Sequence, residues 1–210
     1  MAHSFEAFSG NNDEQAVHEF LRNEARIGNI ESRAREYLDD RTYRNKICFD
    51  SGEYSDALEL YAPVGSYIIQ NIMDHQQDLD TIHLRRPAPD MLPIKILKIA
   101  DEPDSYIIPS EILNIDAILP RSPQYRLEAI TCEINQHNIV FMKHLSTNKW
   151  YYYQNNYTCE QFNNNLNDNL NQILHSRSSI EQKRLIESTH FLISMIFHNA
   201  VQYIYVRVDN

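Results

Sequence analysis

The sequence predicts an α+β fold in which helices flank a mostly antiparallel sheet. Strand-like segments fill the middle of the chain, over residues 53–155, whereas helical periodicity covers residues 13–38 and 160–198. The chain then closes on one more strand-like stretch, residues 200–208. Strands and helices that are grouped along the chain, rather than alternating, are typical of an α+β domain.

Residues 1–12 are expected to form a flexible N-terminus that precedes a single domain over residues 13–210. Asn12 or Asp13 can cap a first helix, and a second apolar stripe follows and ends at about Asp40. The apolar positions of these two helices are Ala16, Val17, Phe20 and Leu21, then Ile27, Ile30, Ala34, Tyr37 and Leu38.

The next part of the chain predicts short strands and one short helix. Ser66 can cap a helix over residues 67–73. Residues 93–100 alternate isoleucines with Lys95 and Leu97, so we expect a strand with both faces largely covered. The other strands expected in this part are residues 57–61, 80–84 and 106–108.

Residues 125–155 predict three consecutive strands. Turn residues at 146–148 separate the second from the third, so these two should form a hairpin. With a period of two, Leu127, Ala129 and Thr131 share one face of the first strand. In the third strand Tyr151 and Tyr153 share one face, opposite Trp150 and Tyr152, and we expect one of these pairs to be exposed or near a partner. The expected strands are residues 125–134, 138–143 and 149–153.

Two helices are expected before the closing strand. The first carries apolar residues at helical spacing between Phe162 and Leu174, although asparagine is a poor helix former. The second is capped by Ser179 and runs to about His198. We interpret the many asparagines as compositional bias rather than as functional residues.

Composition excludes several classes of protein. The net charge of −10 argues against nucleic-acid binding and suits a basic protein partner. No apolar run is long enough for a membrane span, and the N-terminus does not have the pattern of a signal peptide. An odd number of scattered cysteines, three in total, indicates a reducing intracellular compartment, cytoplasmic or nuclear. Without CxxC or HExxH spacing, we expect no metal site and no cofactor.

Seven segments resemble, in the same order, segments of the ubiquitin-specific proteases. The resemblance implies a palm-like sheet of the cysteine-proteinase type. The segments are EQAVHEFL (Glu14–Leu21, similar to QQDAHEFL), Ile47–Met73 near the finger cysteines, LPIKILKI (Leu92–Ile99), Tyr106–Asp116, YRLEAI (residues 125–130), QHNIVFMKHLSTNKWYYYQNN (residues 136–156, similar to GHYVAYVKNLENGKWYLFDDS) and AVQYIYVRV (residues 200–208).

The chain departs from the family pattern at the positions that carry catalysis. His137 matches the catalytic histidine, but Gln154 and Asn155 stand where the family has the Asp or Asn that orients it. The glycine before the histidine is Gln136 here, which would crowd the channel for the substrate tail. No GNTCYMNS box, which holds the nucleophile, precedes Glu14 in this sequence. The resemblance therefore implies a truncated member with an incomplete thumb and a vestigial triad.

Three functions stay open on this evidence. The first is an inactive protease-like domain that binds ubiquitin or another protein; the second is a thiol hydrolase completed in trans; the third is a structural interaction module. The missing cysteine-box region leaves an apolar face of the sheet that either residues 13–38 and 160–198 or a partner must cover. Each candidate binding residue could instead be structural. These residues are Gln15, His18, Glu19, Gln136, Trp150 and Tyr152.

Overall fold

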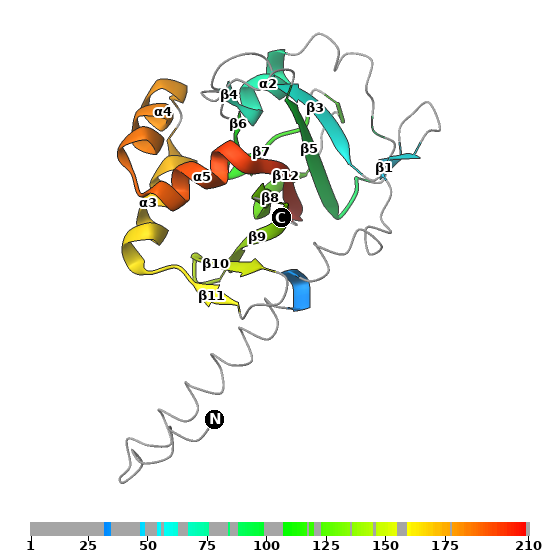
Figure 1. The fold of residues 1–210 in the computed structure, drawn as a ribbon. Coiled ribbons are helices and arrows are strands. Elements are labelled where there is room, and N and C mark those ends of the chain that lie inside the picture. The colour runs from blue at the N-terminus through cyan, green and yellow to red at the C-terminus, as the bar shows by residue number, and fades with distance from the viewer. Residues whose placement is uncertain are drawn as a thin grey trace.

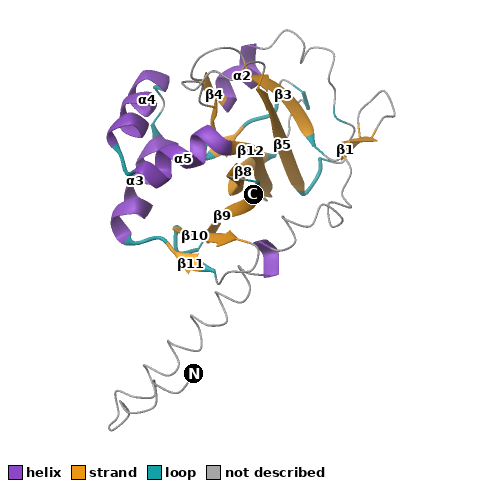
Figure 2. Cartoon of the chain, viewed as in Figure 1, coloured by secondary structure: helices purple, strands orange, loops and turns teal. Residues whose placement is uncertain are grey.

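The computed structural model describes fourteen parts of the chain, and every structural statement below concerns them. The α+β fold is confirmed: the sheet is mostly antiparallel and helices flank it (Figures 1 and 2). Of the helical region expected over residues 13–38, only residues 32–34 are described, and they are helical; the rest lies outside the described residues. The described residues are 32–34, 47–48, 54–55, 57–62, 67–75, 84, 88–98, 107–116, 118–119, 123–134, 136–144, 146–154, 159–176 and 178–208.

The described part of the chain contains short outer strands, long central strands and four labelled helices. The long strands are β5 (Met91–Lys98), β8 (Gln124–Ile134), β9 (His137–His144), β10 (Lys149–Gln154) and β12 (Ala200–Val208). The short strands are β1 (Ile47–Cys48), β2 (Tyr54–Ser55), β3 (Leu58–Ala62), β4 (Tyr67–Ile68), β6 (Ile107–Ile108), β7 (Ile112–Leu113) and β11 (Glu160–Gln161). The helices are α2 (Ile69–His75), α3 (Asn164–His175), α4 (Ser179–Ser188) and α5 (Phe191–Asn199).

The main sheet has the strand order β11-β10-β9-β8-β12-β5-β3, and β7 pairs with β8 beside the end of β9. All of these pairings are antiparallel except that of β3 with β5. The closing strand β12 lies between β8 and β5, at the centre of the sheet. The last segment of the chain therefore holds the two halves of the sheet together.

The sheet has two faces, and both are buried. Helices α2, α3, α4 and α5 pack on what we call the helix face, and Ile69, Leu170, Ile186 and Phe197 join its core. On the other side, the far face, Ala34 packs against the sheet. The apolar face that we expected to be open is thus covered. The sheet residues of the far face are Ala129, Val140, Met142, Tyr151, Tyr153 and Ile204.

A β-bulge corrects the expected pattern of β8. Tyr205 pairs with Leu127 and Ile204 pairs with Ala129, so Glu128 has no partner residue on β12. The extra residue turns Leu127 to the helix face and leaves Ala129 on the far face, so the two do not share a face as predicted. Glu128 is completely buried and forms an ion pair with Arg33.

Two further expectations about the outer elements are wrong. Lys95 of β5 is exposed and pairs with Glu59 of the neighbouring β3, so only one face of β5 is fully covered. The helix expected to begin at Tyr67 begins at Ile69, because Tyr67 and Ile68 pair with β6 as strand β4.

The long helix expected from Ser179 to His198 is two helices. Ser178, rather than Ser179, caps α4 through its hydroxyl, which accepts from the Glu181 backbone N–H. The chain is extended at Thr189 and His190, and the His190 ring then caps α5 by accepting from Leu192 N–H. The break turns α5 back toward the sheet, where it leads directly into β12 (Figure 1).

Buried tyrosines fix the segment before β7 to the central strand. The Tyr203 hydroxyl donates to the Ile107 carbonyl, and that of Tyr205 donates to the Ser110 carbonyl at 2.9 Å. Burial raises the pKa of both phenols well above the usual value. Residues 107–110 are therefore held firmly against the sheet.

Among the described helices, none combines the length and the apolar character that are needed to cross a lipid bilayer.

Candidate functional site

His137 begins β9, at the tip of the hairpin that joins β8 to β9. It pairs with Ile134, and Gln136 lies in the turn between them. Gln136 has φ 64°, in the left-handed region that favours glycine. The position where the resemblance implies a glycine therefore has the backbone shape that glycine adopts most easily. Both Gln136 and His137 are exposed.

Gln154, the other predicted triad position, lies diagonally across from His137. Gln154 pairs with Ile139, which is two residues beyond His137 on β9. Residues two apart on a strand share a face, so His137 and Gln154 both belong to the helix face, as diagonal neighbours roughly 7–8 Å apart. No hydrogen bond joins their side chains, so the amide does not orient the ring in this structure. Asn155 lies outside the described residues.

The two cysteines whose side chains are described are poorly placed to act as nucleophiles toward His137. Cys132 is completely buried, and its thiol donates to the Ile196 carbonyl at 3.4 Å. Cys159 packs against the far face, on the opposite side of the sheet from the ring. A thiol that attacks a protein substrate must be reached by that substrate, so Cys132 is excluded by burial and Cys159 by its face.

Trp150, predicted as a binding residue, lies in the core and is not available to a partner in this structure. It is 0% exposed, and its indole N–H donates to the Asn171 Oδ1 atom at 2.9 Å. Its backbone N–H donates to Asn167 Oδ1 at 2.8 Å. The side-chain amides of Asn167 and Asn171 both donate to the Asn148 carbonyl in turn. Helix α3 covers the face of β10 on which Trp150 lies.

Tyr152 is half-buried beside Trp150, so neither pair of aromatic residues on β10 is exposed as expected. Its ring packs with Phe141 and Phe162, and its hydroxyl donates to Glu160 Oε2 of the edge strand β11 at 2.5 Å. This hydrogen bond, with a smaller effect of burial, raises the pKa of Tyr152 to about 12. Of the predicted binding residues within the described chain, Gln136 and Tyr152 have surface that a partner can contact. Gln15, His18 and Glu19 lie outside it.

An ion network that begins at the buried Lys143, at the other end of β9, was not predicted. Lys143 Nζ lies 2.7 Å from Glu111 Oε1, and His175 Nε2 lies 2.7 Å from Glu111 Oε2. Lys143 is also within 5.8 Å of the centre of the Trp150 ring. The carboxylate thus connects β9, the segment before β7 and the end of α3. Lys143 lies in an otherwise apolar strand, and its position among buried residues is the only feature that distinguishes it from an ordinary surface lysine.

Within the described residues, no group of three or more His, Cys, Asp or Glu side chains is placed to hold a metal ion.

No protein-family model and no curated protein matches the sequence. Solved structures match the chain at low similarity. The yeast SAGA DUB module with a mutant Sgf73 is 14% identical, with a TM-score of 0.44, over 75% of this chain and 35% of that one. The SAGA Ubp8/Sgf11/Sus1/Sgf73 DUB module is 13% identical, with a TM-score of 0.44, over 78% and 37%. An essential yeast splicing factor is 11% identical, with a TM-score of 0.46, over 99% and 50%. The chain therefore spans between about a third and a half of the length of these structures.

Proposed function

We propose that this chain is a ubiquitin-specific protease-like domain that binds a protein partner without cleaving it, and that ubiquitin is the first partner to test. The proposal rests mainly on the arrangement of the residues at the positions that correspond to the catalytic triad. His137 and Gln154 share a face of the sheet, yet no hydrogen bond joins them and neither described thiol can serve them. The seven sequence segments in family order support the choice of partner.

The chemistry of a cysteine protease explains why these positions favour binding over hydrolysis. The histidine must take a proton from a thiol, and a third group must hold its ring and balance the positive charge that forms. An amide can accept from the ring N–H, but it carries no charge, so Gln154 is a weak substitute for a carboxylate. The exposed end of the sheet around Gln136 and His137 still offers polar groups to a partner.

The net charge of −10 agrees with a partner that presents a basic surface or tail. Electrostatic attraction of this kind speeds association and falls as salt is added. Binding that weakens with ionic strength is therefore part of the proposal.

Fluorescence anisotropy with labelled ubiquitin tests the proposal. We expect saturable binding of the chain, and several-fold weaker binding for His137→Ala. The matched control is Lys183→Ala on α4, a residue whose side chain is 42% exposed, which should bind as the unmodified chain does. Without saturable binding at high micromolar concentration, the chain would be an interaction module for some other protein, and ubiquitin would be rejected.

A further inference from the structure

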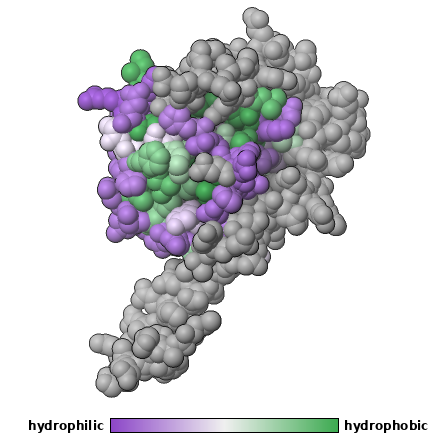
Figure 3. Space-filling model, in the orientation of Figure 1, coloured by the Kyte–Doolittle hydropathy of each residue, from purple (hydrophilic) through white to green (hydrophobic). Residues whose placement is uncertain are grey.

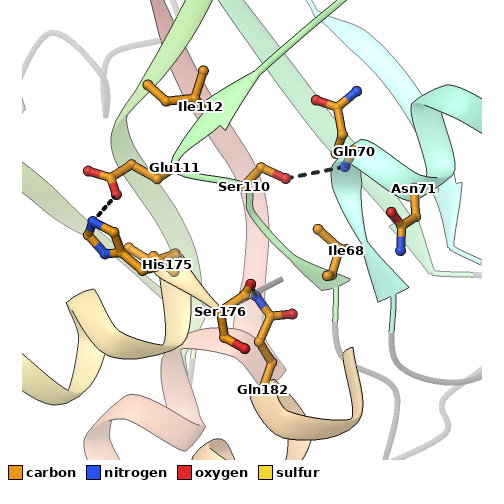
Figure 4. A pocket seen from close by; sticks show the side chains of 10 residues that line it. Ile68, Gln70, Asn71, Ser110, Glu111, Ile112, His175, Ser176 and Gln182 are labelled. Carbon is orange, nitrogen blue, oxygen red and sulfur yellow. Dashed lines mark hydrogen bonds and ion pairs between the residues drawn. The ribbon is translucent and has the colours of Figure 1, made fainter. Parts of the chain in front are cut away.

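A pocket of about 410 Å³ opens on the helix face at the far end of β9 from His137 (Figure 4). It lies between the start of α2, the segment that leads into β7 and the junction of α3 with α4. Glu111 lines it, and the partner of Glu111, Lys143, is six residues along β9 from His137. At about 3.3 Å per residue, this separation is roughly 20 Å. The pocket is therefore distinct from the site of the proposed function.

Gln182 presents a buried, unpaired acceptor to this pocket. Its side chain is completely buried, and Nε2 donates to the carbonyls of Ile173, at 2.9 Å, and Ser176, at 2.8 Å. Because both neighbours are acceptors, the nitrogen must face them, and this fixes the direction of the amide. Oε1 is buried and has no hydrogen-bond partner. Figure 4 shows this oxygen turned to the Ile68 side of the pocket.

Two further polar groups on the wall have unused hydrogen-bonding capacity. Ser110 Oγ accepts a long bond, 3.4 Å, from the Gln70 backbone N–H, and its own proton has no acceptor among the described residues. The exposed carboxamide of Asn71 makes no hydrogen bond to the part of the chain that the structure describes. The pocket thus offers an acceptor at Gln182, a donor at Ser110 and both at Asn71.

The charged groups at the rim are already paired. One oxygen of Glu111 binds Lys143 and the other binds His175, the second pair being drawn in Figure 4. Among the described residues, no unpaired charge therefore lines the pocket. A cationic ligand would have to displace one of these partners. A carboxylate ligand has no proton for Gln182 Oε1 and would lie near the Glu111 carboxylate. The rest of the wall includes the buried apolar residues Ile68 and Leu174. It also includes Gln70 and Ser176, whose side chains already bond to Asn114 and Glu181.

We propose that this pocket binds a neutral carboxamide. The amide N–H of the ligand donates to Gln182 Oε1, and its carbonyl accepts from Ser110 or Asn71. The carbon skeleton packs on Ile68 and Leu174. Pairing the buried oxygen removes the free-energy cost that an unsatisfied acceptor carries, which is the source of selectivity for an amide. The ligand is either a free small amide or the amide of a peptide.

Titration of the isotopically labelled 210-residue chain, followed by NMR, tests this proposal. Nicotinamide represents a free amide, and a capped Ala-Gln-Ala peptide represents a peptide source. Nicotinate and capped Ala-Glu-Ala are the matched carboxylate controls. We expect saturable shifts at the side-chain amides of Gln182 and Asn71, with at least tenfold weaker binding of the carboxylates. The tighter of the two amides identifies the source.

A blocked pocket provides the second arm. Ile112 is 43% exposed at the rim, so Ile112→Trp should fill the mouth and weaken binding at least tenfold. Ile180→Trp, on α4 and 82% exposed outside the pocket, should leave binding unchanged. Gln182→Met removes both hydrogen bonds that join α4 to α3 and can prevent folding. Ile112→Trp is therefore the variant that decides whether the ligand binds in this pocket. The proposal is overturned if neither amide shifts the pocket residues saturably, if the carboxylates bind as well, or if Ile112→Trp has no effect.

Discussion

The indole N–H of Trp150 donates to the Oδ1 atom of Asn171, at 2.9 Å, in the interior of the protein. Asn167, four residues earlier on α3, accepts from the backbone N–H of the same tryptophan. Both amides also donate to the Asn148 carbonyl. Residues four apart lie on one side of a helix, so the two asparagines form a polar strip that fixes α3 to the start of β10.

Asn171→Leu should destabilise the protein, because it leaves the buried indole N–H without an acceptor. The expected loss is roughly 2–3 kcal/mol of unfolding free energy, the cost of an unsatisfied buried donor plus imperfect packing. Asn165→Leu, on the exposed side of α3, should change stability by less than about 0.5 kcal/mol. Urea unfolding monitored by tryptophan fluorescence measures both. Equal effects of the two substitutions would show that the strip does not hold α3.

Gln136→Gly should stabilise the β8–β9 hairpin. A left-handed conformation costs an ordinary residue about 1–2 kcal/mol, and the extra entropy of glycine in the unfolded chain offsets part of the gain. The net increase expected in unfolding free energy is roughly 0.5–1 kcal/mol. Asn148, with φ 56°, is the matched control, because asparagine already tolerates this region. If Asn148→Gly gives the larger increase by thermal or urea unfolding, the explanation from backbone shape fails.

The Lys143–Glu111 pair predicts an asymmetry between its two partners. Glu111→Ala leaves a lysine that is almost fully buried without its carboxylate, and should cost about 3 kcal/mol or more. Lys143→Met keeps the apolar stem and leaves Glu111 partly exposed and still paired with His175, so the cost should be about 1 kcal/mol or less. Chemical unfolding of both variants tests the order. The reverse order would mean that the lysine is better solvated than its position indicates.

Tyr152 predicts a loss of stability at alkaline pH. Its pKa in the folded protein is about 12, against the usual 10.0, because its hydroxyl donates to Glu160. The folded state therefore holds this proton more tightly than the unfolded state does. The contribution of the protonated Tyr152 to the stability of the folded state is complete below pH 10 and is lost as the pH rises toward 12. In NMR of ring-labelled tyrosine, Glu160→Gln should move the pKa of Tyr152 toward its usual value. An unchanged pKa would show that the hydrogen bond to Glu160 is not the cause.

The central strands could be predicted from the sequence, because turn residues separate short runs of β-branched and aromatic side chains. Strands β8, β9 and β10 lie within two residues of the predicted ranges. The bulge at Glu128 could not be predicted, since it depends on the pairing with β12, about 75 residues later in the chain. The break at Thr189 was missed because neither glycine nor proline marks it.

The site could be predicted only in part. His137 and Gln154 lie on one face, as the period of two along β9 and the hairpin pairing require. Trp150 was misjudged, because alternation along a strand places a side chain on a face without telling what covers that face. A signal for the asparagine strip was present: Asn167 and Asn171 occupy the same helical stripe as Leu170 and Leu174. The high frequency of asparagine favoured the interpretation as compositional bias, which hides this signal.

Native mass spectrometry of the chain mixed with ubiquitin that carries a C-terminal electrophile tests the central claim most directly, because one spectrum separates binding from chemistry. The account predicts a one-to-one complex under native conditions that dissociates completely on denaturation, with no mass added to the chain. A covalent adduct that survives denaturation would contradict it by showing an active thiol. The absence of any complex would contradict it by removing ubiquitin as the partner.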